Sequence, residues 1–429
     1  MRTHKIAARA RRSAAALLMI GLTFTTACDQ LLGVTNPSAV PDDLLSDPTL
    51  MPALAAGAIQ TFQCGALQFA ATGGMLAGEY WSSNGFVNNH TWEWRSTADI
   101  KNSPGSCNYG QGTTSMGFYT PLQQARFQLD DAFARFDKFS DAEIANRAKL
   151  MAEFRAEAGY ALVLLAEGMC EMTIDGGPRM TKAQVLAIAK DRFNDAVTRA
   201  TAVGDESLKN MAFVGLARAA LDGGDMPGAA TAARKVTANF VRNLEFSTSV
   251  QSRENRIYDL NVLQDFLSVP PAYQTLTVMV QGQATPQPDP RVPVKNMGRL
   301  ANDGVTPYWQ QLKFASGGGV GLPIASWAEA QLILAEAVGG QEGLDAVNAV
   351  RATKNIQPLV PLPTDTSWTA LVLEERRRQL YSEGQRYADM LRKNLPFQTG
   401  TNRKGQTYND SFTCVPLPNV ETQNNPNFQ

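Results

Sequence analysis

Histidine is nearly absent from this sequence of 429 residues, and neither sign of charge is in marked excess. Of the two histidines, His4 lies in a segment that we expect to be cleaved off, which leaves only His90. Most metal sites and catalytic triads use imidazole, and a formal net charge of -1 offers no basic surface to a nucleic acid. The sequence therefore predicts no metal site, no cofactor and no nucleic-acid partner. We expect His90 to be solvated beside its polar neighbours Asn88 and Asn89.

Motifs for phosphate binding and for acid–base catalysis are also missing. The glycine-rich stretch 317–321 has no P-loop lysine and no G-x-G-x-x-G spacing, so it predicts a flexible connector. Adjacent carboxylates such as Asp130 and Asp131 point in different directions on a helix and do not form a glycosidase pair. We therefore expect a protein that is not an enzyme.

The apolar run at the N-terminus, Ala14–Phe24, is too short to span a bilayer. Basic residues precede it and Thr25-Thr26-Ala27-Cys28 follows it, a pattern typical of a bacterial lipoprotein signal. The sequence predicts a signal peptide of residues 1–27 and a lipid anchor on Cys28, the first residue of the mature chain. Secretion without a lipid is the alternative.

Four cysteines remain after Cys28, namely Cys64, Cys107, Cys170 and Cys414. In an exported chain an even number favours disulfides, here two. The spacing lacks the C-x-x-C pairs of a zinc site. Three connectivities are possible, and we favour Cys64–Cys107 with Cys170–Cys414. The first bridge would staple a loop-rich region, and the second would tie the tail to a core helix.

Helical periodicity covers most of the mature chain, which predicts an all-α fold in a single domain of residues 28–429. The expected helices lie within 42–62, 121–171 (two helices), 181–202, 207–236, 323–338, 343–353 and 366–393. Within 207–236, small residues flank a break at Gly223-Gly224-Asp225, as in the helix–turn–helix of a tetratricopeptide unit. Two long loop insertions are expected at about 72–120 and 246–322, the second with one hairpin at most.

The segment Leu373–Arg392, LEERRRQLYSEGQRYADMLR, combines dense charge with an apolar stripe at helical spacing. We call it the signature segment and expect one buried helix. Glu374 precedes Arg378 by four residues, Glu383 precedes Arg386 by three, and Arg386 precedes Asp389 by three, so each acid has a base one turn away. A nucleic-acid site would leave its arginines unpaired.

The signature segment resembles the E-R-R-x-E-L-x-x-E-G-x-R-x-x-D-L-x-R pattern of the SusD/RagB family, with Gln379 where that pattern has glutamate. Further similar blocks are 155–177, the Asp289-Pro290-Arg291 turn, 323–337, 348–351 and 416–428. In the block 323–337, Ser326 stands where the pattern has arginine. The resemblance implies a scaffold of tetratricopeptide-like helical hairpins.

The same resemblance implies a function and a location. It implies a lipid-anchored protein on the cell surface of the outer membrane, which binds a nutrient such as an oligosaccharide. It implies delivery of that nutrient to a partner, a SusC-like TonB-dependent transporter. A secreted glycan hydrolase and a tetratricopeptide-like scaffold that binds only protein remain the alternatives.

Aromatic side chains concentrate in the first expected loop, together with polar groups that suit sugar hydroxyls. The candidate ligand-binding residues are Glu79, Tyr80, Trp81, Asn84, Trp92, Trp94 and Arg95, with Trp309 as a weaker candidate in the second loop. Trp92 and Trp94 would share one face of an extended segment. The alternative is that these aromatic residues pin the loop to the scaffold.

Overall fold

The computed structural model describes residues 45, 47–107, 116–249, 253–280, 282–360 and 367–428. The predicted signal peptide and Cys28 lie outside the described residues. The chain divides into two units, Met1–Leu50 and Met51–Gln429. In the described part of the first unit, the 3-10 turn η2 (Pro48–Leu50) begins where the Asp47 carboxylate accepts a hydrogen bond from the Thr49 backbone N–H at 2.8 Å. Apart from η2, all features below belong to the second unit. The prediction of a single domain from residue 28 stays a prediction.

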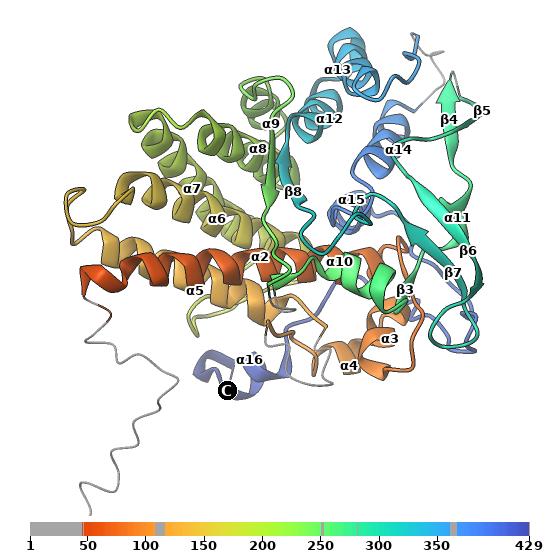
Figure 1. The fold of residues 1–429 in the computed structure, drawn as a ribbon, viewed down its shortest axis with the longest axis horizontal. Coiled ribbons are helices and arrows are strands. Elements are labelled where there is room, and N and C mark those ends of the chain that lie inside the picture. The colour runs from red at the N-terminus through yellow and green to blue at the C-terminus, as the bar shows by residue number, and fades with distance from the viewer. Residues whose placement is uncertain are drawn as a thin grey trace, which may run out of the picture. The chain divides into compact units, whose positions relative to one another are not determined.

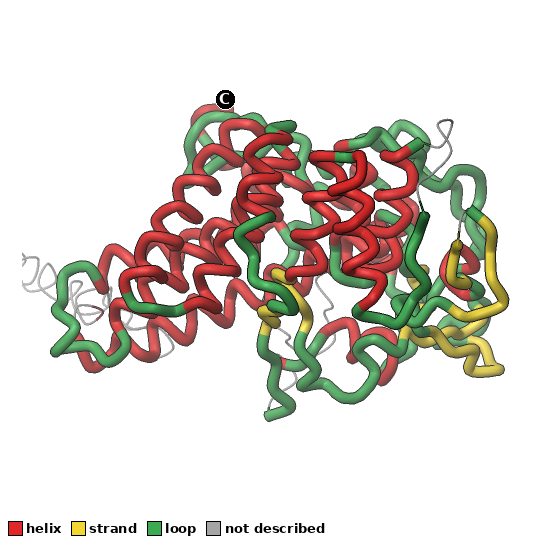
Figure 2. The backbone as a smooth tube through the Cα atoms, turned by 90° about the horizontal axis from the view of Figure 1, so that it is seen from above, coloured by secondary structure: helices red, strands yellow, loops and turns green. Residues whose placement is uncertain are grey.

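Five long helices and the shorter α9 pack as successive neighbours in the order of the chain (Figures 1 and 2). They are α2 (Met51–Leu76), α5 (Tyr119–Phe136), α6 (Arg147–Gly168), α7 (Lys182–Ala202), α8 (Glu206–Asp222) and α9 (Met226–Ala233). Several begin at side chains that satisfy free backbone N–H groups. Thr181 forms a capping box with Gln184 before α7, and the Asp225 carboxylate accepts from the Gly228 N–H before α9. Their order agrees with the predicted helical hairpins.

Small residues allow α6, α7 and α8 to approach closely around one ring. A Cβ added at Gly159 of α6 would lie 2.7 Å from the Phe193 ring of α7, and one at Gly215 of α8 would lie 2.3 Å from it. Such distances are too short for any real contact, so both positions require glycine unless the ring moves. The alternation of small and large residues in the sequence therefore sets the packing of these hairpins.

α2 with its preceding turn, Pro48–Leu76, is the one described segment long and apolar enough to cross a membrane by length and composition. Most positions from Phe62 to Leu76 are buried, and α2 contacts α5, α6 and α15 (Gln385–Arg392). That is the environment of a core helix. The helix predicted at 42–62 is thus shifted, because the apolar pattern continues through Leu76 before Gly78 turns the chain with φ 71°.

The second helical group is α12 (Trp327–Val338), α13 (Gly340–Ala352), α14 (Trp368–Gln379) and α15. The helix predicted from Pro323 begins four residues later, because 322–326 form strand β8 (Leu322–Ser326), which pairs with β2 (Val241–Leu244). Ser326 then serves as N-cap, its Oγ accepting from the Glu329 N–H at 3.1 Å.

The signature segment is two helices, so the prediction of one was wrong. α14 ends at Gln379, and the chain turns through Gly384, whose φ of 78° favours glycine, before α15 begins. A Cβ on Gly384 would also lie 2.9 Å from the Ala70 Cα of α2. The break follows from this close approach, which helical periodicity within the segment does not report.

The ion pairs of the signature segment mostly reach beyond their own helix. Glu374 pairs with Arg378 at 2.7 Å, as predicted. Asp389 forms ion pairs with Arg376 at 2.9 Å and with Arg392 at 2.7 Å. Glu383 takes Lys313 at 2.6 Å, in place of the predicted Arg386.

The Glu375 carboxylate accepts from the guanidinium groups of Arg291 at 2.5 Å and Arg351 at 2.7 Å. All three side chains are at most 5% exposed. The signature segment therefore joins elements that are far apart in sequence.

Outside the long helices, four two-stranded antiparallel sheets are described. Besides β2–β8 they are β1 (Trp81–Ser82) with β3 (Leu267–Ser268), β4 (Thr277–Val280) with β5 (Gln283–Pro288), and β6 (Val294–Leu300) with β7 (Pro307–Gln311). Short helices are α3 (Val87–Trp94), α4 (Thr97–Ile100), α10 (Arg256–Tyr258), the π-helix η4 (Asp259–Leu263), α11 (Pro271–Gln274), α16 (Asn419–Asn424) and η5 (Pro426–Phe428). Both predicted loops thus hold more structure than expected, while the mostly helical fold class is confirmed.

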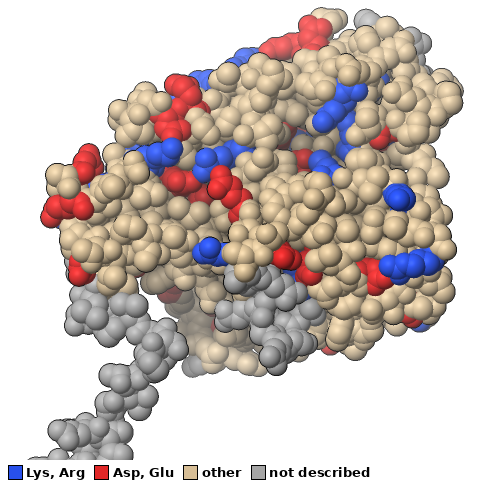
Figure 3. Space-filling view, in the orientation of Figure 1, with Lys and Arg blue, Asp and Glu red and all other residues tan. Residues whose placement is uncertain are grey.

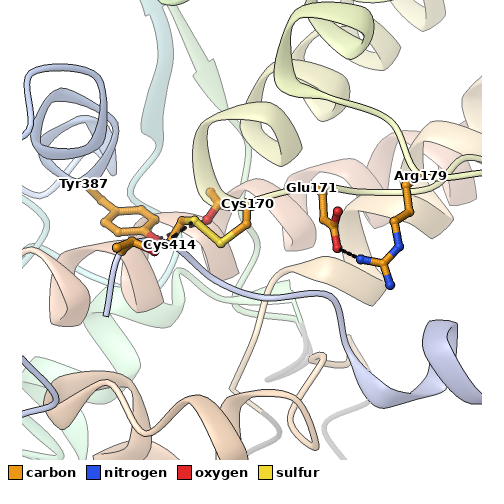
Figure 4. Close-up of a disulfide and its surroundings, with 7 residues drawn as sticks. Cys170, Glu171, Arg179, Tyr387 and Cys414 are labelled. Atoms are coloured by element: carbon orange, nitrogen blue, oxygen red, sulfur yellow. Dashed lines mark hydrogen bonds and ion pairs between the residues drawn. A yellow bond between two sulfur atoms is a disulfide. The ribbon is translucent and has the colours of Figure 1, made fainter. Parts of the chain in front are cut away.

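Two disulfides join the described cysteines. Cys64 of α2 bonds to Cys107, and Cys170 after α6 bonds to Cys414 in the tail, with Cα–Cα distances of 6.0 and 5.2 Å. This is the pairing that the sequence favours. The second bridge lies beside Tyr387 of α15 (Figure 4), whose hydroxyl donates to the Gly168 carbonyl at 3.1 Å. It thereby fastens the tail where α6 and α15 meet.

Candidate ligand-binding surface

The residues Glu79–Arg95, which we call the aromatic segment, begin by folding against the turn between α14 and α15. The Glu79 carboxylate accepts a hydrogen bond from the Ser382 backbone N–H at 3.0 Å, and the Tyr80 hydroxyl bonds to the Ser382 hydroxyl. Glu79 and Tyr80 are both 0% exposed. Burial raises the pKa of Glu79 to about 7, against the smaller opposing effect of the Ser382 N–H. These two residues anchor the segment to the scaffold.

Asn84, Trp92 and Arg95 are buried as well, at 0, 2 and 1% exposure. The Asn84 side chain donates to the Phe266 carbonyl at 3.0 Å, and the Arg95 guanidinium lies over the Tyr408 ring at 4.9 Å. Direct ligand contact by these three residues, or by Glu79 and Tyr80, does not fit their burial, because no surface is left for a sugar to cover. For these five candidates the alternative interpretation applies, that they pin the segment to the scaffold.

Trp92 and Trp94 lie on a helix, so the predicted extended segment was wrong. Positions two apart on a helix face different directions, and here only Trp92 is fully covered. Trp94 keeps some exposed surface and stacks on His90, with ring centroids 5.7 Å apart. α3 ends at Trp94, and its C-cap residue Arg95 has a φ of 61°.

His90 is buried in this structure, at 7% exposure, so the expected solvated side chain was wrong. Both ring nitrogens lie 3.4 Å from the Lys404 ammonium. Burial and that neighbouring charge lower the pKa of His90 to about 4, which keeps the imidazole neutral at physiological pH. It acts as a flat packing surface for Trp94.

Trp81 and Trp309, which lie far apart in sequence, both adjoin strand β3. Trp81 pairs with Ser268 across β1–β3, and the Ser268 hydroxyl accepts from the Trp309 N–H at 2.9 Å. The Arg403 guanidinium lies 4.4 Å from the centroid of the Trp81 ring. Three of the predicted ligand residues keep some exposed surface, namely Trp81, Trp94 and Trp309. For these three, ligand contact stays a prediction.

Exposed apolar side chains lie on the segments around β3. We call them the apolar corner: Phe86, Val87, Leu263, Leu300 and Val305, each between 45 and 61% exposed. The Phe86 ring packs edge-on against Phe266 at 5.4 Å. Backbone and ion-pair contacts hold these segments together, with the Asp303 N–H donating to the Ser83 carbonyl at 3.0 Å and Arg299 pairing with Asp265 at 2.5 Å. α3, β3 and the β6–β7 hairpin lie together in Figure 1.

The charged side chains around the apolar corner are matched. Arg403 pairs with Glu93 at 2.5 Å, and Lys404 pairs with Asp303 at 2.8 Å. Although burial opposes ionisation, hydrogen bonds from Lys404 and from Thr306 lower the pKa of Asp303 to about 2. This surface offers ring stacking and hydrogen bonds from a fixed frame, while its carboxylates are engaged by cations. Sequence reasoning missed Arg403, Lys404 and Asp303, because no motif marks residues that meet only through the fold.

No protein-family model and no curated protein sequence matches this chain. Solved structures do match. A SusD-like protein from Bacteroides fragilis superposes with a TM-score of 0.63 at 13% identity, over 90% of this chain and 97% of its own. A SusD homologue from Bacteroides thetaiotaomicron gives 0.62 at 14% identity, over 91% and 98%. The chain has the SusD-like fold. This agrees with the fold that the signature segment implies.

Two further structures with the SusD-like fold have names that state what they bind. One is a SusD-like carbohydrate-binding protein from Bacteroides vulgatus, with a TM-score of 0.62 and 13% identity over 89% of this chain and 97% of that one. The other is a laminarin-binding SusD-like protein, with a TM-score of 0.55 and 15% identity over 87% and 97%. At such identities the likeness is one of fold.

Proposed function

We propose that this protein binds a neutral oligosaccharide at the apolar corner and at the neighbouring half-buried residues Trp81 and Trp94. The observation that carries this proposal is the combination of exposed apolar side chains with a polar frame whose charges are already paired. Sugar rings present C–H faces that stack on aromatic rings, and their hydroxyls hydrogen-bond to polar neighbours. Because the nearby cations and carboxylates neutralise one another, a neutral ligand suits this surface better than a charged one.

The names of two structures with the same fold support the ligand class, since one binds carbohydrate and the other laminarin. We further propose that Cys28 carries a lipid that holds the protein on the outer surface of the outer membrane. There it would pass its ligand to a SusC-like TonB-dependent transporter. The sequence of the N-terminal segment and the resemblance of the signature segment support these two points.

Calorimetry against a panel of neutral and acidic oligosaccharides, laminarin included, tests ligand binding. We expect Phe86→Ala to weaken the best ligand about tenfold, because truncation removes one stacking surface. Phe127→Ala is the matched control, since Phe127 is also exposed, at 55% against 45% for Phe86, but lies on α5. Equal affinity of both variants and the unchanged protein would contradict the proposed surface.

Trp81→Ala extends the test to a half-buried ring and should weaken binding further, with loss of the Arg403 contact. Chromatography of the sugar after incubation separates binding from the hydrolase alternative. Intact ligand fits the proposal, whereas shortened products would favour the hydrolase.

The partner and the anchor need native membranes. Purification of the full-length protein from its own cells should bring down a large TonB-dependent β-barrel, and intact mass should show acyl chains on Cys28. A mature chain without acyl groups would refute the anchor, and a preparation free of any barrel would refute the transport role while leaving sugar binding intact.

A further inference from the structure

A cavity of about 400 Å³ opens between the β2–β8 sheet, the turn at Pro290–Pro293 and the end of α14. This is within the range of small-molecule sites in proteins. Figure 3 shows charged side chains within a hollow on the face drawn in Figure 1. The cavity shares no lining residue with the apolar corner.

Aromatic rings and prolines form the apolar part of the cavity wall. Phe240 and Trp327 line it together, held next to one another by the Trp327 N–H, which donates to the Phe240 carbonyl at 2.8 Å. Both rings are half-buried, so each keeps a surface toward the cavity. Pro290, Pro293 and Pro323 complete this wall. Rigid rings of this kind give a sugar ring a stacking surface at little entropic cost.

The charges that line the cavity interior are matched with one another. The Lys313 ammonium donates to Glu383 at 2.6 Å and to the carbonyls of Gln379 and Tyr381 at 3.1 and 3.0 Å. Arg291 pairs with Asp289 at 2.8 Å and with Glu375. Lys354 also lines the cavity and has no carboxylate partner among the described residues, but its side chain is exposed to solvent. The buried charges of the wall are balanced, which favours a neutral molecule against them.

One polar atom of the wall lacks a partner. The amide oxygen Oε1 of Gln379 is buried and accepts no hydrogen bond within the described part of the chain. A buried acceptor without a donor is costly, and each such group in a folded protein calls for an explanation, of which a bound molecule that supplies the donor is one. A hydroxyl group on a ligand in the cavity would supply it.

The two departures from the family pattern noted in the sequence both line this cavity. They are Gln379 in place of glutamate and Ser326 in place of arginine. Ser326 is a short side chain whose Oγ is occupied as the N-cap of α12. An arginine at 326 would extend into the space that serine leaves open.

From these observations we propose that the cavity is a second binding site, which takes one neutral sugar unit with a ring face on Trp327 and a hydroxyl donating to Gln379 Oε1. The choice of sugar rests on the proposed function, but the site is separate from the apolar corner. It would hold a free monosaccharide or a terminal unit of a longer chain.

Saturation-transfer NMR on the whole mature protein tests this site, with glucose, galactose, xylose and N-acetylglucosamine as probes at millimolar concentration. We expect transfer to at least one sugar, and Ser326→Arg should abolish it by filling the cavity. Ser326→Ala is the matched control, because it also removes the N-cap hydroxyl but leaves the cavity open; it should retain the signal. Gln379→Met keeps the size of the side chain, removes the acceptor and should weaken binding about tenfold. Thermal unfolding of each variant shows that it is folded.

Several outcomes would overturn the site. These are no transfer to any probe in the unchanged protein, transfer that persists in Ser326→Arg, and loss of the monosaccharide signal in Phe86→Ala, which would place the sugar at the apolar corner. If Phe86→Ala leaves oligosaccharide binding unchanged and Ser326→Arg still abolishes the monosaccharide signal, only the proposed surface is refuted. The two proposals can therefore fail independently. Methyl glycosides of the best probe distinguish a terminal unit of a chain from a free sugar. A site for a terminal unit binds these glycosides, whereas a site for a free sugar does not, because their anomeric hydroxyl is blocked.

Discussion

The signature segment and the aromatic segment meet at Ser382, and each holds a buried carboxylate. The pKa values of these two carboxylates are shifted in opposite directions. Asp389 is 1% exposed and Glu79 is 0% exposed. Burial raises the pKa of both, but Asp389 lies between the guanidinium groups of Arg376 and Arg392, which lower its pKa to about 2. Among the described residues Glu79 receives one N–H bond, from Ser382, and burial raises its pKa to about 7. The number of cationic partners decides which effect wins.

This difference separates two tasks of the same fold. The signature segment uses ion pairs to join α12, α14, α15 and the Asp289–Arg291 turn, so its charges serve the scaffold. The buried residues of the aromatic segment attach it to the scaffold, whereas Phe86 and Val87 are exposed and Trp81 and Trp94 are half-buried. Dense charge in the sequence therefore marks the frame, whereas the proposed ligand surface lies where charges are few and paired. Five experiments can break or sharpen this comparison.

Glu375→Ala should have the largest effect, a loss of about 3 to 5 kcal/mol in the free energy of unfolding. The change leaves the guanidinium groups of Arg291 and Arg351 buried without their shared carboxylate. Urea denaturation measures it. Glu374→Ala is the control one residue away, because Glu374 has a side chain 37% exposed, and its loss should cost at most about 1 kcal/mol. Similar costs for both would show that burial does not set the strength of these pairs.

Replacing Cys170 and Cys414 by serine should lower the free energy of unfolding by about 2 to 4 kcal/mol. The bridge closes a sequence separation of 244 residues, against 43 for Cys64–Cys107, so the unfolded chain gains more freedom when it is removed. The double variant at Cys64 and Cys107 is the comparison and should cost less. Thermal unfolding of both measures the difference, and the reverse order would mean that native contacts outweigh chain entropy.

Glu79→Gln should change how stability depends on pH. The folded-state pKa of about 7 lies above the ordinary 4.5, so the folded state holds the proton more tightly. This contribution is fully present below pH 4.5 and is lost as pH rises through 7, a loss of about 3 kcal/mol. Urea denaturation from pH 5 to 8 should show a decline in the unchanged protein that is absent in the variant. Parallel curves would mean that Glu79 is ionised in the folded state throughout.

Asp389 should act in the opposite direction. Its folded-state pKa of about 2 lies below the ordinary 3.8, so its contribution is present above pH 3.8 and is lost as pH falls through 2. Acid unfolding of the Glu79→Gln variant should therefore keep its steep decline below pH 4. If the variant resists acid, the ion pairs of the signature segment do not account for the loss of stability below pH 4.

The smallest effects concern two rings of the aromatic segment. Tyr80→Phe removes the hydroxyl bonded to Ser382 and should cost about 1 kcal/mol in stability, with affinity for sugar unchanged. Phe86→Ala should change stability by less than about 0.5 kcal/mol, since its ring is exposed, while affinity falls. Calorimetry and urea denaturation on both variants give the cross-comparison. A large stability loss in Phe86→Ala would assign that ring to the scaffold.

Much of the scaffold could be predicted because its causes are local. Helical periodicity located α5 to α9, and turn residues such as Asp225 placed the break between α8 and α9. The candidate surface was predicted less well. Periodicity did not reveal α3, a helix of 8 residues without a side-chain cap, so the directions of Trp92 and Trp94 were misjudged. Arg403 and Lys404 reach the surface from more than 300 residues away, and no local pattern reports such contacts.

The sequence by itself determined the helical scaffold, its caps, the small residues at close helix contacts and the dense charges of the signature segment, because each depends on neighbours within a few positions. Only the tertiary structure decided which aromatic rings stay exposed, which acids receive two cations and which receive none, and where a cavity opens beside Ser326 and Gln379. Those outcomes depend on burial and on partners distant in the chain, and burial is a property of the packed whole.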